Sequence, residues 1–219
     1  MAQLQHRSMS DFATAAIRQM ILTGELKPGA RVDQNEMAKL LDISRNPVRQ
    51  AIERLAERGF VQSRPHRSVI VSELSIADME QVYAARKLLE DEAIRLSWPH
   101  YDRDFLDRAR VLTDAMAKAG RNSDLDNYML HNLEFHMNFY RLCGNVHIIR
   151  VISSLFELSE RYQRTALMTA PRAASVASEH SGMLGAISDG DLERLLALSH
   201  QHNEGTRQAV RNNVVPEAG

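Results

Sequence analysis

The stretch of sequence that decides the fold is PGARVDQNEMAKLLDISRNPVRQAIERLAERGFV, residues 28–61. The spacing of its apolar residues predicts one helix over residues 34–41 and a second that starts after Ser44 and ends before Gly59. Ser44 is a favourable N-cap, and Pro47 lies in the first turn, where a missing N–H is harmless. A short turn between the two helices makes the pair a helix-turn-helix.

Elements on either side complete a small domain. Residues 10–23 carry apolar side chains at i, i+4 spacing, which predicts a one-sided helix capped by Ser10 or Asp11. Residues 60–63 and 68–72 are strand-like, and a basic tip separates them. Three short helices followed by two strands predict a winged helix-turn-helix.

The second helix of the pair has the composition of a DNA-contacting helix. An α-helix fits the major groove, and arginine binds the O6 and N7 atoms of guanine bidentately. Arg45 and Arg49 lie four residues apart and therefore share one face, although the same charges would also suit a solvated helix surface. The residues expected to contact DNA are Arg31, Asn35, Ser44, Arg45, Asn46, Arg49, His66 and Arg67.

The rest of the chain predicts helices only. Apolar stripes of helical period cover residues 76–97, 102–118, 125–142, 146–168, 173–188 and 191–212, with a break over residues 169–172. Six helices joined by short loops predict an antiparallel bundle. The predicted fold class is therefore mainly α: a winged helix-turn-helix over residues 1–74, an all-α bundle over residues 75–212 and a disordered tail over residues 213–219.

Seven of the nine histidines lie in the helical part. Asn132 and His136 share a helix face, while His180 and His202 belong to two later helices. Convergence of three imidazoles and one amide oxygen would suit zinc or another divalent transition metal. His200 lies only two residues from His202, so both cannot face the core. Spacing alone leaves open that each histidine is an ordinary core or surface residue.

The order of residues in the opening stretch resembles the N-terminal domain of GntR-family bacterial transcription regulators. Residues 44–52, SRNPVRQAI, match that family's pattern S-R-T-P-V-R-E-A-L almost residue for residue. The resemblance implies a homodimer that binds double-stranded DNA at a pseudo-palindromic operator. Asn46 stands where the family usually has Thr, which leaves base preference open, and Ser68 stands where the wing often has Gly, which leaves the approach of the wing to DNA open.

Two later segments resemble the FCD domain of the FadR subfamily. These are NLEFHMNFYRLCGN, residues 132–145, and SEHSGMLGAISDGD, residues 178–191, followed by a histidine twelve residues after Gly190. The resemblance implies a divalent metal, zinc first and nickel or another transition metal as alternatives. The ligands it implies are Asn132, His136, His180 and His202. At the first of these positions many members have Asp, and a neutral amide gives a cation less charge.

In that subfamily the metal usually holds a small carboxylate effector, whose other end a guanidinium takes. Arg86, in YAARKLLEDEA, resembles the family's R-x-x-L-E, so Arg86 and Tyr83 are the expected effector-binding residues. The alternative for Arg86 is a surface ion pair with Glu90, four residues later.

Composition limits the classes of protein further. Residues 1–72 hold 11 Lys and Arg against 7 Asp and Glu, whereas residues 73–219 hold 16 against 21, which indicates two domains with different partners. No apolar run approaches the ~20 residues of a membrane span. The polar N-terminus and the single cysteine, Cys143, predict a cytoplasmic protein that does not contact a membrane.

Three hypotheses follow. The first is a ligand-responsive transcription regulator, by family habit a repressor, whose bundle binds metal plus a carboxylate effector. The second is a metalloenzyme in which three histidines activate water or an organic acid; no H-E-x-x-H motif supports it. The third is an architectural DNA-binding dimer that responds to no effector.

Overall fold

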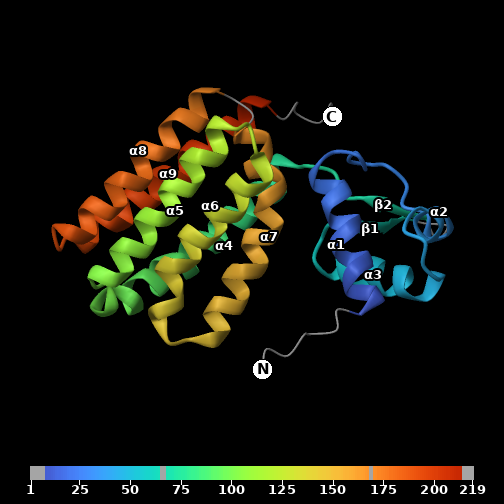
Figure 1. Ribbon diagram of the computed structural model, residues 1–219, viewed down its shortest axis with the longest axis horizontal. Helices are drawn as coiled ribbons and strands as arrows, with labels where there is room; N and C mark the ends of the chain where they lie inside the picture. The colour runs from blue at the N-terminus through green and yellow to red at the C-terminus, as the bar shows by residue number, and fades with distance from the viewer. Residues whose placement is uncertain (1–7, 65–67, 168–169, 214–219) are drawn as a thin grey trace. The chain divides into compact units, whose positions relative to one another are not determined.

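The computed structural model describes residues 8–64, 68–167 and 170–213. His66, Arg67 and the predicted tail beyond Asn213 therefore lie outside the described residues. The chain forms two compact units, residues 1–74 and 75–219 (Figure 1). Each unit has its own hydrophobic core. Within the described part, helices and one two-stranded sheet confirm the predicted fold class.

The N-terminal unit holds three helices and the wing. Its elements are α1 (Met9–Leu22), α2 (Gln34–Leu40), α3 (Arg45–Glu57) and the antiparallel strands β1 (Val61–Arg64) and β2 (Ser68–Val71). Helix α3 packs against both α1 and α2, because its apolar face points inward. The fully buried side chains of this core include Ile17, Val48, Leu55 and Phe60.

The cap of α1 differs from the prediction. Ser8 is the N-cap: its hydroxyl accepts a hydrogen bond from the Asp11 N–H at 3.1 Å, and its own N–H donates to the Asp11 carboxylate at 3.1 Å. This reciprocal pair satisfies the N–H groups of Ser8 and Asp11 and places the cap two to three residues earlier than expected. The predicted cap at Ser10 or Asp11 is therefore wrong, and Ser10 lies buried in the first turn.

The segment before α2 is attached to the wing. The Val32 N–H donates to the Val69 carbonyl at 2.8 Å, and the Val71 N–H donates to the Ala30 carbonyl at 2.8 Å. Arg31, between these bonds, is bridged to Ile70 of β2. Backbone hydrogen bonds thus fix Arg31 beside the wing.

The C-terminal unit is an all-helical bundle. Its helices are α4 (Ile76–Ser97), α5 (Arg103–Arg121), α6 (Leu125–Tyr140), α7 (Val146–Leu167), α8 (Ala170–Ser188) and α9 (Leu192–Asn213). Helix α5 packs against α6, α8 against α9, and α4 against α7 and α9 (Figure 1). The predicted start of the fifth of these helices at residue 173 is wrong. Helix α8 is described from Ala170, so Pro171 lies within the helix and not in a break before it.

Aromatic rings link the bundle core to the histidines. The ring of Phe105 stacks on Tyr101 with centroids 4.4 Å apart and meets Phe139 edge to face at 5.3 Å. Phe135 lies 5.0 Å from Phe139 and stacks on the imidazole of His180 at 4.2 Å. Among the helices that the structure describes, none is both long and apolar enough to cross a membrane.

Leu55→Ala should destabilise the N-terminal unit by about 2–5 kcal/mol, because Leu55 is fully buried and its truncation leaves a cavity. Leu40→Ala is the matched control: Leu40 is 57% exposed, so its truncation should change the free energy of unfolding by less than about 0.5 kcal/mol. Chemical denaturation followed by circular dichroism measures both. Equal losses in the two variants would contradict this core.

Candidate metal centre and DNA-binding surface

Three histidines from three helices meet inside the bundle. His136 belongs to α6, His180 to α8 and His202 to α9, and all three are buried. One ring nitrogen from each lies within 4.8 Å of the others. The ring centroids are 4.9–5.2 Å apart. The structure thus brings together the three histidines that the sequence analysis selected.

The local sequence explains which residues take part. Asn132 lies one helical turn before His136, and both are buried on the same face of α6. His202 faces the interior of the bundle, whereas His200 is half-exposed and its Nε2 lies 2.6 Å from the Asp91 carboxylate. The expected choice of His202 over His200 agrees with this packing.

The protonation state of the cluster suits metal binding. Burial lowers the pKa of His136 and His180 well below 6.5 and also lowers the pKa of His202, and the positive charge of Arg172 adds to the effect in all three. Uncharged imidazole is the form that binds metal. The Nε2 atom of His180 is buried and, among the described residues, has no hydrogen-bond partner. The donor set therefore fits a divalent metal ion.

A carboxylate orients one of the three rings. The Nδ1 atom of His202 lies 2.7 Å from the Oε2 atom of Glu179, whose other oxygen accepts from Arg172 at 2.6 Å. Burial opposes ionisation of Glu179, but hydrogen bonds from His202 and Arg172 outweigh it and lower its pKa to about 2. Carboxylate-to-histidine bonds of this kind fix the tautomer of metal ligands, so the Nε2 atom of His202 is left for the cluster.

Arg86 is buried rather than at the surface. Its guanidinium donates to Glu90 at 2.6 Å, to Ser159 at 2.9 Å and to Asn203 at 3.3 Å. The predicted pairing with Glu90 is present, but the alternative that placed this pair on the surface is wrong, since both side chains are almost fully buried. The aromatic face of Tyr83 lies 4.7 Å from the guanidinium carbon.

Arg86 is also electrostatically close to the histidines. Its guanidinium carbon lies 3.8 Å from the ring centroid of Phe156, whose ring is 5.4 Å from that of His136. Its positive charge contributes, after burial, to the lowered pKa of His136 and His202. A cavity of about 590 Å³ opens between α4 and α9 and is lined in part by Tyr83 and Asn203.

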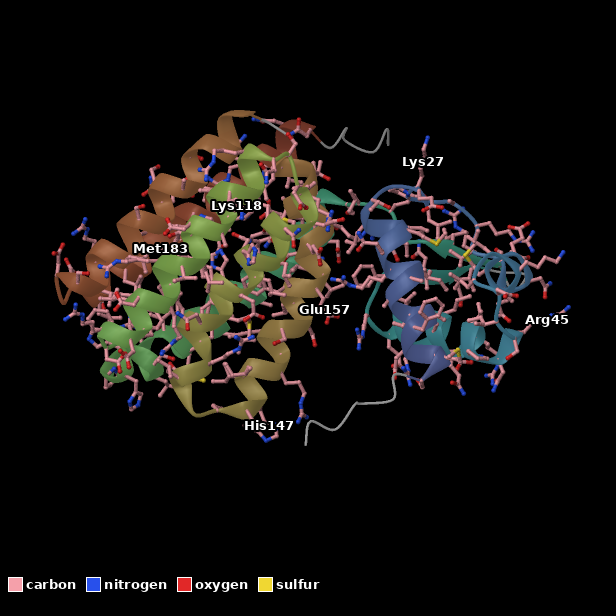
Figure 2. All side chains as sticks on the ribbon, viewed as in Figure 1. Lys27, Arg45, Lys118, His147, Glu157 and Met183 are labelled. Atoms are coloured by element: carbon pink, nitrogen blue, oxygen red, sulfur yellow. The ribbon has the colours of Figure 1, made fainter. Side chains whose placement is uncertain are left out.

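The expected DNA-binding residues that the structure describes lie on the surface of the N-terminal unit. Figure 2 shows the Arg45 side chain projecting outward from the start of α3. Arg49 is exposed and donates to Glu53 at 2.7 Å and to Asn46 at 2.8 Å. The remaining exposed members of the set are Arg31, Asn35 and Ser44, of which Ser44 is the N-cap of α3.

Sequence reasoning missed the residues that support the histidines. Glu179 lies in the segment over residues 178–191 that resembles the FCD domain, next to His180, and that adjacency was a usable signal. Arg172, Ser159 and Asn203 carried none, because their roles depend on how α7, α8 and α9 pack together.

Known proteins resemble this chain over most of its length. Residues 9–71 match the gntR family of bacterial regulatory proteins, and residues 81–205 match the FCD domain. A relative from Streptomyces ambofaciens, described as an uncharacterized HTH-type transcriptional regulator in an unstable DNA locus, is 29% identical over 88% of this chain and 80% of its own length. A probable D-xylose utilization operon transcriptional repressor from Paenarthrobacter nicotinovorans is 30% identical over 62% of this chain and 59% of its own.

Solved structures share the fold. E. coli McbR/YncC covers 94% of this chain and 98% of its own with a TM-score of 0.79 at 18% identity. A putative GntR transcriptional regulator from Rhodococcus sp. RHA1 covers 94% and 99% with a TM-score of 0.79 at 19% identity. Together with the family matches, which span both units, these likenesses identify a transcription regulator and not an enzyme. The chain belongs to the GntR family of bacterial DNA-binding transcription regulators and carries an FCD effector domain.

Proposed function

We propose that this regulator releases or binds its operator in response to a small carboxylate that docks at a metal ion in the helical unit. The observation that carries the proposal is the cluster of His136, His180 and His202, three buried and uncharged imidazoles that include an Nε2 atom without a partner among the described residues. A buried polar atom without a hydrogen-bond partner costs free energy, and a bound cation would give the Nε2 atom of His180 a partner.

The metal of the proposal is zinc, with nickel or another transition metal as the alternative. Three imidazoles with room for further ligands suit zinc. Asn132, one turn before His136, would offer an amide oxygen as the fourth protein ligand. When bound, the ion would supply positive charge and open positions for an anion.

Arg86 and Tyr83 are proposed as the effector-binding residues. The charge of Arg86 acts on His136 and His202, which supports its nearness to the cluster. Glu90 now neutralises that guanidinium, so a carboxylate effector would have to compete with Glu90 for it. The cavity is lined by Tyr83, whose ring contacts the Arg86 guanidinium, and by Asn203, which accepts a hydrogen bond from it.

The DNA-binding part of the proposal places α3 in the major groove. Arg45, Asn46 and Arg49 would meet base edges, and Ser44, Asn35 and Arg31 would contact the phosphate backbone. His66 and Arg67, which lie between β1 and β2 in the sequence, are proposed as further DNA contacts. A homodimer would present two such helices to a pseudo-palindromic operator.

Effector binding would change operator affinity because the effector binds the DNA-competent and DNA-incompetent dimers unequally. The relative named as a repressor supports repression as the mode.

A thermal-shift screen tests the effector. Small organic and sugar acids should raise the melting temperature of Zn²⁺-loaded protein, because a ligand that binds only the folded state stabilises it. Chelation of the metal should remove that stabilisation. A shift that survives chelation would contradict docking at the metal. No shift with any acid would favour the architectural alternative over this proposal.

His180→Ala should abolish stoichiometric Zn²⁺ binding, because it removes one of the three converging imidazoles. His147→Ala is the matched control: His147 is exposed at the start of α7 (Figure 2), and its loss should leave one Zn²⁺ per chain. Atomic spectroscopy after dialysis measures the metal content of both variants. Full occupancy in the His180 variant would refute the ligand assignment.

Arg45→Ala should weaken operator binding by about 1–3 kcal/mol if Arg45 contacts guanine. Binding to random DNA should fall much less, because base contacts are absent there. The control is Arg103→Ala, an exposed arginine of α5 in the other unit. Fluorescence anisotropy with both DNAs at one salt concentration measures the difference. Equal losses on the operator and on random DNA would assign Arg45 to phosphate.

A further inference from the structure

Arg172 is a buried arginine whose hydrogen-bond partners lie on two helices. Its side chain is only 5% exposed, near the start of α8. It donates to Ser175 at 2.9 Å and Glu179 at 2.6 Å on its own helix. Across the helix interface it donates to the His202 carbonyl at 2.8 Å and the Thr206 hydroxyl at 3.0 Å of α9. The guanidinium thus joins α8 to the turn of α9 that carries His202.

A glycine makes room for this guanidinium. A Cβ atom added at Gly205 would lie 2.8 Å from the Nη1 atom and 3.1 Å from the Cζ atom of Arg172. Glycine inside a helix is destabilising relative to alanine, so its presence in the middle of α9 calls for a reason. Gly185 of α8 offers the contrast, since a Cβ atom there would meet nothing within 4 Å. A side chain at position 205 would therefore require the Arg172 guanidinium to shift.

The surroundings of His202 select one tautomer. Its Nδ1 atom lies 2.7 Å from the Glu179 carboxylate and 3.3 Å from the Nη2 atom of Arg172. A guanidinium only donates and an ionised carboxylate only accepts. The shorter contact therefore takes the proton of Nδ1, and Nε2 keeps the lone pair that a metal needs.

We infer that Arg172, seated against Gly205, is the positioning residue that holds the Glu179 carboxylate and thereby keeps His202 in its metal-binding tautomer. The inference rests on the proposed metal function and adds Arg172 and Gly205 to it, neither of which is a metal ligand. Glu179 is half-buried, and the bond from Arg172 to its Oε1 atom restrains the carboxylate whose Oε2 atom contacts His202. Outer residues that orient metal ligands in this way typically change metal affinity 10–100-fold when lost.

The first measurement is Zn²⁺ affinity by chelator competition for wild type, Gly205→Ala, Arg172→Gln and the control Gly185→Ala. Gly205→Ala and Arg172→Gln should bind Zn²⁺ about 10–100-fold more weakly, and Gly185→Ala should match wild type. Gly205→Ala adds a good helix former, so its metal-free melting temperature is the check against general destabilisation. Wild-type affinity in a folded Gly205→Ala or Arg172→Gln protein would overturn the inference.

The second measurement needs no metal. Nitrogen-15 NMR of the imidazoles in metal-free protein should show Nδ1–H for His202 in wild type and Gly185→Ala, and a tautomer mixture in Gly205→Ala and Arg172→Gln. An unchanged tautomer in both of those variants would overturn the inference. If wild type binds no Zn²⁺ at all, the proposed function fails, and the tautomer measurement still decides this inference.

A double-mutant cycle tests whether Arg172 acts on His202 through Glu179. Arg172→Gln and Glu179→Gln should each weaken Zn²⁺ binding, and the double variant should lose little more than either single variant, because both changes release the same ring. Additive losses would show that Arg172 acts independently of Glu179 and would contradict the inference.

Discussion

The helical unit depends on three imidazoles that share one buried space and stay uncharged. His136, His180 and His202 lie with ring centroids 4.9–5.2 Å apart, so protonation of two of them would place like charges together in a low-dielectric interior. Burial prevents this by lowering the pKa of each ring. The uncharged rings then pack as aromatics against Phe135 and Phe156. The same condition that permits the packing leaves nitrogen lone pairs available to a metal ion.

Two buried arginines near this cluster make similar sets of contacts. Arg86 pairs with Glu90 on its own helix, and Arg172 pairs with Glu179 on its own helix. Each guanidinium then reaches α9, Arg86 at Asn203 and Arg172 at His202. Buried ion pairs contribute little net stability, because desolvation offsets their attraction, so their effect here is geometric. Helix α9 is the element where the proposed effector side and the proposed metal side meet, at adjacent residues.

The DNA-binding unit depends on exposed charge and not on buried polar contacts. Arg45 and Arg49 are exposed, and the bonds of Arg49 to Glu53 and Asn46 are surface contacts that exchange at small cost. Its core only has to hold α3 rigid, which Val48 and Leu55 do from the opposite face. Surface charge on a rigid helix supports DNA binding, whereas the metal centre needs convergence of distant segments.

The sequence by itself determined the fold class and the choice of His136, His180 and His202, because helical periodicity and motif order are local properties that lie along the chain. It also placed Arg86 beside Glu90 by their four-residue spacing, but not in the interior. Only the tertiary structure decided that this pair is buried, that Ser8 caps α1, and that Arg172 lies against Gly205 to hold Glu179 on His202. The contacts of Glu179 with His202 and of Arg172 with Gly205 join residues 23 and 33 positions apart across a helix interface, and no local pattern specifies which side chains meet there.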